Sequence, residues 1–278
     1  MLSERVIPQR LTYVDGYAIR YLDYDSHLDK SSKHKFLVLL HGLGASAERW
    51  IFIADTLAKH FRVIIPDIIG FGYSDKPTVE YTREFFIEFF KGFLEGLNIT
   101  QPILVGSSFG GYLATEFAIK FNDQVEKLVL AAPAGMMRSS TNVLDQYIMA
   151  ALYPTYENAL RGFMDMAFDP SIVTEETIRD FINRMRLPNA KYAFMSTLLG
   201  NRDSPRLYDR LDKIRAPTLL IWGDNDKMIP LQYSTDYTKI PNSRIRIMKD
   251  CGHTPYVEKP AEFNQILLGF ISEKKGDN

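Results

Sequence analysis

Short, uniformly apolar runs alternate along the chain with longer segments in which apolar residues recur at helical spacing. The runs are typical of strands buried on both faces of a parallel sheet, and the longer segments are typical of amphipathic helices. Four apolar runs occur in the first half of the chain, at residues 36–40, 61–65, 102–105 and 125–132. Helical spacing occurs between them, at residues 47–59, 82–97 and 112–119. This alternation predicts βαβ crossovers and a mainly parallel sheet.

The two ends of the chain extend this pattern. Residues 11–24 alternate between apolar and polar side chains on both sides of Asp15-Gly16, and an Asp-Gly pair between two such runs predicts a β-hairpin. Near the C-terminus, two further strands and a final helix are predicted at residues 217–222, 243–248 and 260–272. We therefore expect a protein of the α/β class.

The strand pattern stops between residues 134 and 212. This segment predicts several helices separated by prolines, and we interpret it as a helical cap, 134–212, inserted into a core domain formed by 1–133 and 213–278. The segment contains seven of the ten methionines and many aromatic residues. These side chains either fill the space between cap and core or form an adaptable apolar wall that binds a substrate.

A serine flanked by glycines follows the run at 102–105, immediately before a helical segment. The pattern from Gly106 to Gly110 is G-x-S-x-G, and between a strand and a helix it predicts a nucleophile elbow. The serine in such a turn holds a strained backbone that projects its hydroxyl above the sheet, and only small residues fit two positions before and after it. Ser108 is therefore the candidate nucleophile, because Ser107 lacks the paired glycines.

A serine hydroxyl needs a neighbouring base, since it is almost never ionised at neutral pH. The chain has five histidines. We expect His27, His34 and His60 to be surface residues, and His41 adjoins a glycine-containing loop. His253 follows the last predicted strand, at the sheet edge where the carboxyl ends of parallel strands meet. His253 is therefore the candidate base.

The base must be oriented by an acid at the same edge of the sheet. The strand at 125–132 runs into residues 133–135 without a carboxylate, whereas the strand at 217–222 leads into Asp224 and Asp226. Either one gives the chain order Ser, Asp, His that is expected when a nucleophile elbow belongs to an open α/β sheet. The pattern alone does not choose between them.

Negative charge that develops on the substrate needs backbone N–H donors. One donor is expected from Phe109, the residue after the nucleophile. The other is expected from Leu43, in the loop after the strand at 36–40. We expect His41 and Gly42 to support this loop, as Gly106 and Gly110 support the elbow.

Composition and charge exclude other classes. The chain has 278 residues, a formal net charge of -1 and a single cysteine, so a nucleic-acid-binding surface and internal disulfides are not expected. Residues 1–10 lack the apolar stretch of a signal peptide, and no stretch is long enough to span a membrane. We found no metal-ligand cluster and no nucleotide-binding motif, and therefore expect a cytoplasmic protein without cofactor or metal that acts on a small molecule.

Together these motifs resemble those of the α/β-hydrolase superfamily, over almost the whole chain. The resemblance rests on the segments 41–44, 67–77, 106–110, 222–226 and 252–253, which occur in the family's order. It implies an eight-stranded sheet with a cap inserted after the sixth strand. It also favours Asp226 over Asp224, because in relatives the acid is the third residue after the glycine that ends this strand.

Two subfamilies are similar. One is the capped carboxylesterases and lactonases, which imply cleavage of an ester or lactone with an apolar part through an acyl-enzyme. The other is the hydrolases of meta-cleavage products, which break a carbon–carbon bond beside a ketone and which 106–111 and 132–136 resemble. The chain departs from them in its shorter loop after His41 and in Thr254, which replaces a tryptophan.

We therefore predict a serine esterase or lactonase. The alternatives are a carbon–carbon bond hydrolase, in which Arg184 or Arg186 binds a substrate carboxylate, and a non-catalytic receptor for a small ligand.

Overall fold

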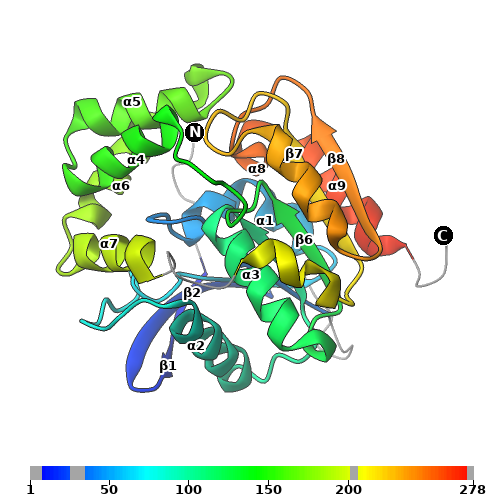
Figure 1. Cartoon of the computed structure of the whole chain (residues 1–278). Coiled ribbons are helices and arrows are strands. Elements are labelled where there is room, and N and C mark those ends of the chain that lie inside the picture. Colours follow the sequence, from blue (N-terminus) through cyan, green and yellow to red (C-terminus); the bar gives the residue numbers. More distant parts are fainter. Residues whose placement is uncertain (1–7, 26–34, 201–205, 274–278) are drawn as a thin grey trace.

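An eight-stranded sheet forms the centre of the molecule (Figure 1). The computed structural model describes residues 8–25, 35–200 and 206–273. The strands are β1 (Gln9–Val14), β2 (Tyr17–Tyr24), β3 (Phe36–Leu40), β4 (Arg62–Pro66), β5 (Ile103–Ser107), β6 (Lys127–Ala131), β7 (Thr218–Gly223) and β8 (Ser243–Met248).

The strand order is β1-β2-β4-β3-β5-β6-β7-β8. The hairpin strand β2 pairs antiparallel with β1 and β4, and the pairs from β4 through β8 are parallel. Parallel neighbours place their carboxyl ends at one edge, so the segments that follow β3, β5, β7 and β8 lie at the same edge of the sheet. The α/β class and the mainly parallel eight-stranded sheet are thus confirmed.

Helices cover both faces of the sheet and form a further layer beside it. The α-helices are α1 (Ile51–Leu57), α2 (Arg83–Gly96), α3 (Phe109–Lys120), α4 (Asn142–Leu152), α5 (Tyr156–Met166), α6 (Glu175–Met185), α7 (Ala190–Gly200), α8 (Pro255–Glu258) and α9 (Pro260–Ser272). Short 3₁₀ helices are η1 (Ala47–Trp50), η2 (Asn122–Gln124), η3 (Pro170–Ile172), η4 (Leu207–Lys213) and η5 (Leu231–Lys239).

The core is divided by the sheet into two layers. Along β3, Leu37 and Leu39 join the apolar cluster under α1 and α9, whereas Val38 and Leu40 join the cluster under α2 and α3. This alternation is the two-residue period of a strand, and it explains why a strand buried on both faces is uniformly apolar. Figure 1 shows α2 and α3 on one side of the sheet and α1 and α9 on the other.

The segment between β6 and β7 contains α4, α5, α6 and α7, which gather at one end of the molecule, in green to yellow-green in Figure 1. We call these four helices the helical insertion. The hydroxyls of Thr141, Thr155 and Thr174 cap the first turns of α4, α5 and α6 by accepting hydrogen bonds from backbone amides. The insertion follows the sixth strand, as the family resemblance implies, and the division into core and cap at residues 134 and 212 stays a prediction.

The methionines of the predicted cap divide between both interpretations. Met136 and Met185 are buried in the core, Met137 and Met166 line a cavity, and Met149 is exposed.

Two details differ from the predicted elements. The helix expected at 47–59 begins as the 3₁₀ helix η1, and 207–213 forms η4, whose Arg210 pairs with Glu116 of α3.

Parts of the sequence interpretation lie outside the described residues. These are His27, His34 and most of the N-terminal segment that lacks a signal-peptide pattern. Within the described ranges, we found no helix with the length and apolar character needed to cross a bilayer.

Candidate active site

Ser108 occupies a strained turn between β5 and α3. Its backbone has φ 53° and ψ -118°, a conformation that side chains with a Cβ rarely adopt. The chain around this turn is tightly packed: a Cβ on Gly106 would lie 2.3 Å from the carbonyl oxygen of Gly110, and a Cβ on Gly110 would lie 2.3 Å from that of Leu40. Both flanking positions therefore require glycine. The turn has the geometry of a nucleophile elbow.

His253 and Asp226 form a buried pair beyond the ends of β8 and β7. Nδ1 of His253 lies 2.8 Å from Oδ2 of Asp226, and the carboxylate fixes Nδ1 as the donor. Oδ1 of Asp226 accepts hydrogen bonds from the backbone amides of Met228 and Ile229, at 2.9 and 2.8 Å. The other ring nitrogen of His253, Nε2, has no hydrogen-bond partner among the described residues. It is therefore available to accept a proton.

Asp224, the alternative acid, lies elsewhere. Its Oδ1 accepts hydrogen bonds from the side chain of Asn225 and the backbone amide of Cys251, and its side chain is exposed. Asp224 thus stabilises the turn after β7, and the structure brings Asp226 rather than Asp224 to His253. His60 is exposed, as expected.

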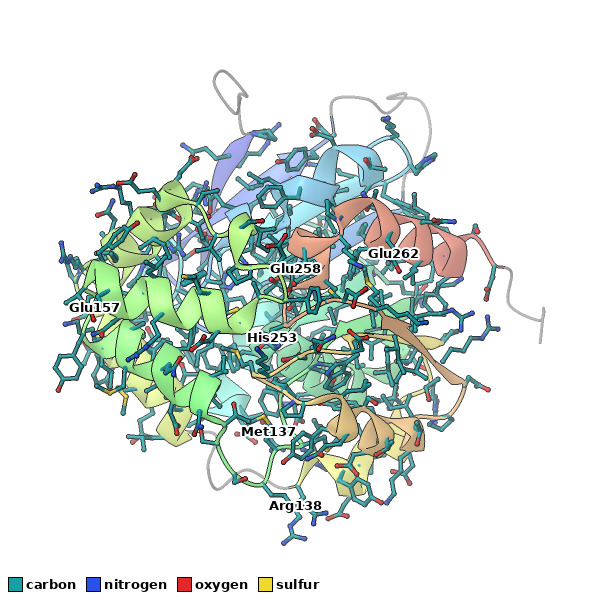
Figure 2. The ribbon with its side chains drawn as sticks, turned by 90° about the horizontal axis from the view of Figure 1, so that it is seen from above. Met137, Arg138, Glu157, His253, Glu258 and Glu262 are labelled. Carbon is teal, nitrogen blue, oxygen red and sulfur yellow. The ribbon has the colours of Figure 1, made fainter. Side chains whose placement is uncertain are left out.

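The loop that carries His253 is held by a carboxylate that the sequence patterns did not single out. Oε2 of Glu258 accepts hydrogen bonds from the backbone amides of Gly252 and Phe168, each at 2.9 Å, and Oε1 accepts one from Thr254 at 3.2 Å. Figure 2 shows His253 and Glu258 near the centre of the molecule, between the helical insertion and α9. The backbone on both sides of His253 is thereby fixed.

The backbone amides of Leu43 and Phe109 have no hydrogen-bond partner within the described parts of the chain, and both residues line the same cavity as Ser108. Phe109 is the first residue of α3, where an N–H group lacks an intrahelical acceptor. The carbonyl oxygen of Leu43 accepts a hydrogen bond of 2.7 Å from the hydroxyl of Tyr147 in α4. This bond links the helical insertion to the loop after β3.

His41 is completely buried beneath this loop. Its Nε2 accepts a hydrogen bond from the amide of Ile68 at 3.0 Å, so Nδ1 carries the proton and donates to the carbonyl oxygen of Gly42 at 2.8 Å. Burial lowers the pKa of His41, although the nearby Asp67 opposes this effect. The neutral ring supports the loop, and Gly42 leaves the space next to Ser108 open, since its Cβ would lie 3.4 Å from that of Ser108.

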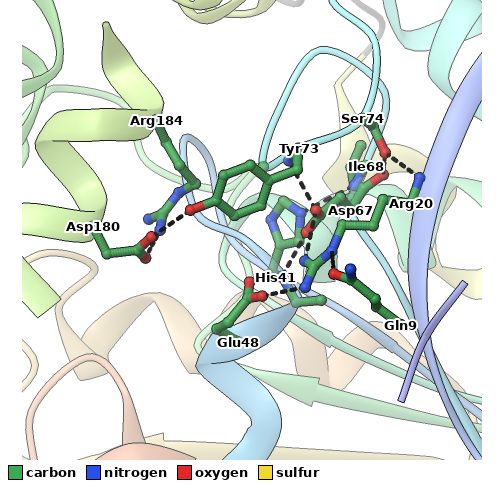
Figure 3. Close-up of polar contacts among 12 residues, drawn as sticks. Gln9, Arg20, His41, Glu48, Asp67, Ile68, Tyr73, Ser74, Asp180 and Arg184 are labelled. Carbon is green, nitrogen blue, oxygen red and sulfur yellow. Dashed lines mark hydrogen bonds and ion pairs between the residues drawn. The ribbon is translucent and has the colours of Figure 1, made fainter. Parts of the chain in front are cut away.

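A cluster of buried charges anchors the same loops from behind (Figure 3). Asp67 follows β4 and is fully buried; it accepts hydrogen bonds from the amides of Ala47 and Tyr73, at 2.7 and 2.8 Å, and from Arg20 at 3.0 Å. Arg20 also pairs with Glu48. A buried carboxylate that accepts this many hydrogen bonds fixes the surrounding backbone.

A cavity of about 530 Å³ lies between the sheet edge and the helical insertion. Ser108 and His253 line it, and most of its other side chains are apolar. Acidic side chains are absent from its lining within the described residues, and the arginines that line it are Arg49, Arg184 and Arg206. The cavity therefore suits a small molecule that has an apolar part and a negatively charged part.

The two candidate arginines of the cap differ in position. Arg184 is buried, with 4% of its surface exposed, and lines the cavity. It forms an ion pair with Asp180, which also accepts a hydrogen bond of 2.7 Å from the hydroxyl of Tyr73 (Figure 3). Arg186 is exposed and donates to the carbonyl oxygen of Pro154. Of the two, only Arg184 can reach a molecule in the cavity.

The part of the chain that the structure describes contains no group of three or more His, Cys, Asp or Glu side chains placed to hold a metal ion.

A sequence model described as the alpha/beta hydrolase family matches residues 37–266. The chain belongs to this family. The general assignment as a hydrolase follows from that membership, and the roles of individual residues in this alpha/beta hydrolase stay predictions.

Several named proteins are similar to this hydrolase over most of its length. It is 32% identical over 264 residues to the 2-hydroxy-6-oxononadienedioate/2-hydroxy-6-oxononatrienedioate hydrolase of Paraburkholderia phymatum, covering 88% of this chain and 90% of the relative. A crystal structure of a meta-cleavage product hydrolase from Pseudomonas fluorescens superposes with a TM-score of 0.82 and 26% identity, covering 94% of this chain and 97% of the other. A membrane phospholipase A superposes with a TM-score of 0.84 and 25% identity, covering 95% and 86%.

Sequence reasoning about this hydrolase missed Arg49, Tyr147 and Glu258. These residues come from η1, α4 and α8, and none belongs to a motif with a fixed spacing from Ser108. A signal existed only for Glu258, an acidic residue five positions after His253 in a predicted sheet-edge loop.

Proposed function

We propose that this protein is a serine hydrolase that cleaves a carbon–carbon bond beside the ketone of a 2-hydroxy-6-oxodienoate. Such acids are named as substrates of the Paraburkholderia relative and of a 2-hydroxymuconate semialdehyde hydrolase from a Pseudomonas species. This proposal replaces ester or lactone cleavage as the preferred reaction, because the relatives named for carbon–carbon cleavage cover most of the chain.

The observation that carries the proposal is the position of Arg184. A guanidinium buried in an apolar cavity is costly unless it is paired, and a carboxylate matches its planar set of donors. Arg184 has one ion-pair partner, Asp180, and its Nε has no hydrogen-bond partner within the described residues. A substrate carboxylate in the cavity would supply the missing acceptor.

In the proposed first step, the hydroxyl oxygen of Ser108 bonds to the ketone carbon of the substrate while His253 takes the hydroxyl proton. The ketone oxygen becomes an oxyanion, which the amides of Leu43 and Phe109 stabilise by hydrogen bonds. Asp226 keeps His253 in the tautomer that accepts this proton and stabilises the imidazolium that results.

Carbon–carbon cleavage then requires a leaving group that can hold the electron pair of the broken bond. The substrate meets this requirement in its 2-oxo-enoate tautomer, because the electron pair is delocalised through the double bond onto the 2-oxygen. The imidazolium of His253 returns its proton to this fragment, which leaves as a 2-hydroxydienoate. The positive charge of Arg184 stabilises the fragment while its negative charge is greatest.

The second step releases the acid. The first step leaves an ester between Ser108 and the acyl part of the substrate. Water attacks this ester with His253 again as the base, the same two amides stabilise the oxyanion, and the carboxylic acid departs while Ser108 recovers its proton. The sum is one water consumed for each bond cleaved.

Ester cleavage is the second candidate. Two observations favour it: Thr254 stands where the resemblance to carbon–carbon hydrolases requires a tryptophan, and the loop after His41 is shorter than theirs. A phospholipase is also among the proteins with the same fold. Esters would react through the same steps, with an alkoxide as the leaving group.

The deciding experiment compares 2-hydroxy-6-oxo-6-phenylhexa-2,4-dienoate, the substrate named for a Burkholderia cepacia relative, with p-nitrophenyl esters of increasing chain length. We expect loss of the dienolate absorbance and release of benzoate, with a higher kcat/KM than for any ester. Turnover of the esters alone would contradict carbon–carbon cleavage and support the second candidate. Turnover of neither class would support a non-catalytic receptor.

A further inference from the structure

The cavity contains a second arginine that the proposed reaction does not use. Arg49 comes from η1, the 3₁₀ helix that follows the loop after β3, and it lines the same cavity as Arg184. The two arginines therefore reach the cavity from different parts of the fold. Arg49 comes from the sheet side, and Arg184 comes from α6 of the helical insertion.

Arg49 is half-buried, and its charge is not neutralised by a neighbouring carboxylate. The carbon of its guanidinium lies 5.7 Å from the centre of the Phe163 ring, and the described residues contain no ion pair that includes it. The carboxylate next to it in sequence, Glu48, is paired with Arg20 behind the cavity wall. Arg49 also donates a hydrogen bond to the hydroxyl of Tyr256, but a ring contact and a neutral acceptor offset only part of the cost of removing a guanidinium from water.

The positive charges of both arginines act on one side chain, Tyr147. Burial raises the pKa of Tyr147 to about 12, and the charges of Arg184 and Arg49 oppose this effect. The ring of Tyr147 lies 6.0 Å from that of Phe163, over which Arg49 lies. The ring of Phe181, one turn before Arg184 on α6, lies 5.5 Å from the ring of Tyr147, so both arginines lie near Tyr147 and near the loop that contains Leu43.

Two positive charges that line one apolar cavity attract an anion more strongly than they would in water, because the dielectric constant is lower. Asp180 compensates Arg184 in part and also accepts a hydrogen bond from Tyr73. The described lining of the cavity contains no acidic side chain that could compensate Arg49. An anion bound beside Tyr147 would interact with both positive charges and would supply an acceptor for the unpartnered Nε of Arg184.

We propose that Arg49 and Arg184 form a two-arginine anion site beside Tyr147, which binds the acidic end of a 2-oxo or 2-hydroxy acid, and that Arg49 determines the preference for that end. The statement that this acidic end belongs to the substrate of a carbon–carbon hydrolase rests on the proposed function. The statement that the cavity binds such acids is independent of the proposed function, because it follows from the charge of the arginines alone.

Such an acid presents two groups of oxygen atoms. Its carboxylate offers a planar pair of acceptors to one arginine, and the oxygen on the neighbouring carbon offers a third acceptor, which carries negative charge in the enolate form. One arginine neutralises the carboxylate. The second arginine donates to the oxygen on the neighbouring carbon and contributes to binding only when that oxygen is present. A neutral ester or ketone of the same shape gains little from either charge.

The test measures binding directly and without turnover. Phenylpyruvate, a 2-oxo acid with an apolar ring, and methyl phenylpyruvate, its neutral ester, are titrated by calorimetry into the wild-type protein and into variants. We expect the wild type to bind the acid at least about tenfold more tightly than the ester, as loss of hydrogen bonds to a charged group predicts. Arg49→Gln reduces this ratio about tenfold, and Arg49→Lys retains part of it.

The matched control is Arg186→Gln, which removes an exposed arginine of the same segment that lies outside the cavity lining. It should keep the ratio of the two dissociation constants at the wild-type value. Circular dichroism on each variant checks that the fold is retained, and Arg49→Lys serves as the measured variant if Arg49→Gln is unstable. An Arg49→Gln protein that loses affinity equally for acid and ester would show a structural role and overturn the proposal.

The result also separates the two proposals. A protein that binds phenylpyruvate through Arg49 but does not cleave a dienoate retains the anion site and refutes the proposed reaction. A protein that cleaves the dienoate with an unchanged acid-to-ester ratio in Arg49→Gln retains the reaction and refutes the role of Arg49.

Discussion

The backbone carbonyl of Met166, at the end of α5, accepts a hydrogen bond of 3.1 Å from the backbone amide of His253. Glu258 joins the same two segments a second time, because its carboxylate accepts from the amide of Phe168 and from the residues on both sides of His253. The loop that carries the proposed base is therefore fixed by the helical insertion as well as by the sheet.

This arrangement predicts that Glu258 positions His253. Glu258→Ala leaves three backbone amides without their acceptor, so we expect kcat to fall about tenfold to a hundredfold, as small displacements of a base typically cause. The control is Glu262→Ala, an exposed residue in the first turn of α9, which should behave as wild type. Steady-state kinetics on the preferred substrate make the comparison, and equal rates for the two variants would argue against the positioning role.

The second prediction concerns the nucleophile. Ser108→Ala should lower kcat by at least about four orders of magnitude, because the acyl-enzyme can no longer form. The neighbouring Ser107→Ala should retain turnover, since its hydroxyl lies outside the strained position of the turn. Rapid-quench measurements and a melting curve for each protein distinguish loss of chemistry from loss of fold. Substantial activity in Ser108→Ala would exclude the acyl-enzyme mechanism.

The third prediction separates the two acids. Asp226→Asn removes the charge that orients His253 and stabilises its protonated form, so kcat should fall by about four orders of magnitude. Asp224→Asn keeps an amide oxygen that can accept from Cys251 and should retain most of the activity. The test compares kcat of the two variants, measured under the same conditions. A larger loss in Asp224→Asn than in Asp226→Asn would assign the role of the acid to Asp224.

The fourth prediction concerns the space around the elbow. Gly110→Ala places a methyl group 2.3 Å from the carbonyl oxygen of Leu40, and we expect it to lower the free energy of unfolding by at least about 3 kcal/mol. Gly269, in the middle of α9, has open space around it. Gly269→Ala should therefore raise the free energy of unfolding by about 0.5–1 kcal/mol. Urea denaturation measures both, and a stable Gly110→Ala protein would contradict the packing described.

The fifth prediction is a dependence of stability on pH. Burial lowers the pKa of His41 below its ordinary value of 6.5. As the pH falls below about 6.5, the unfolded chain binds a proton that the folded protein does not, and the free energy of unfolding decreases. His41→Gln removes this contribution, so its stability should decline less steeply between about pH 7 and about pH 5. Parallel curves for the two proteins would show that His41 is readily protonated in the fold.

Much of the fold could be predicted because its signals are local. The uniformly apolar strands report burial on both faces, and the glycines around Ser108 report a turn that admits no Cβ. His253 could be found because few histidines follow a predicted strand. Local signals do not report which side chains of separate helices meet, and for this reason the contacts of Arg49 and Glu258 were not predicted.

The choice of reaction was also beyond the sequence patterns. The same turn, base and acid would attack an ester or a ketone, so these residues do not distinguish the bond that breaks. In the proposed function the preference comes from charge in the cavity, which Arg184 lines from the helical insertion. From the sequence, Arg184 and Arg186 were equivalent, because which face of α6 is turned toward the cavity depends on packing that the helical pattern does not specify.

The hydrogen bond from Tyr147 to the carbonyl oxygen of Leu43 has a consequence for redesign. This bond joins α4 of the helical insertion to the loop that contains Leu43, whose amide is a proposed donor to the oxyanion, so a change in the insertion would also shift that loop. If the insertion of a relative replaced this one and lacked a hydroxyl at the position of Tyr147, we expect both the reaction rate and the substrate selectivity to change. A chimera that keeps Tyr147 would allow selectivity to be altered without a change in rate.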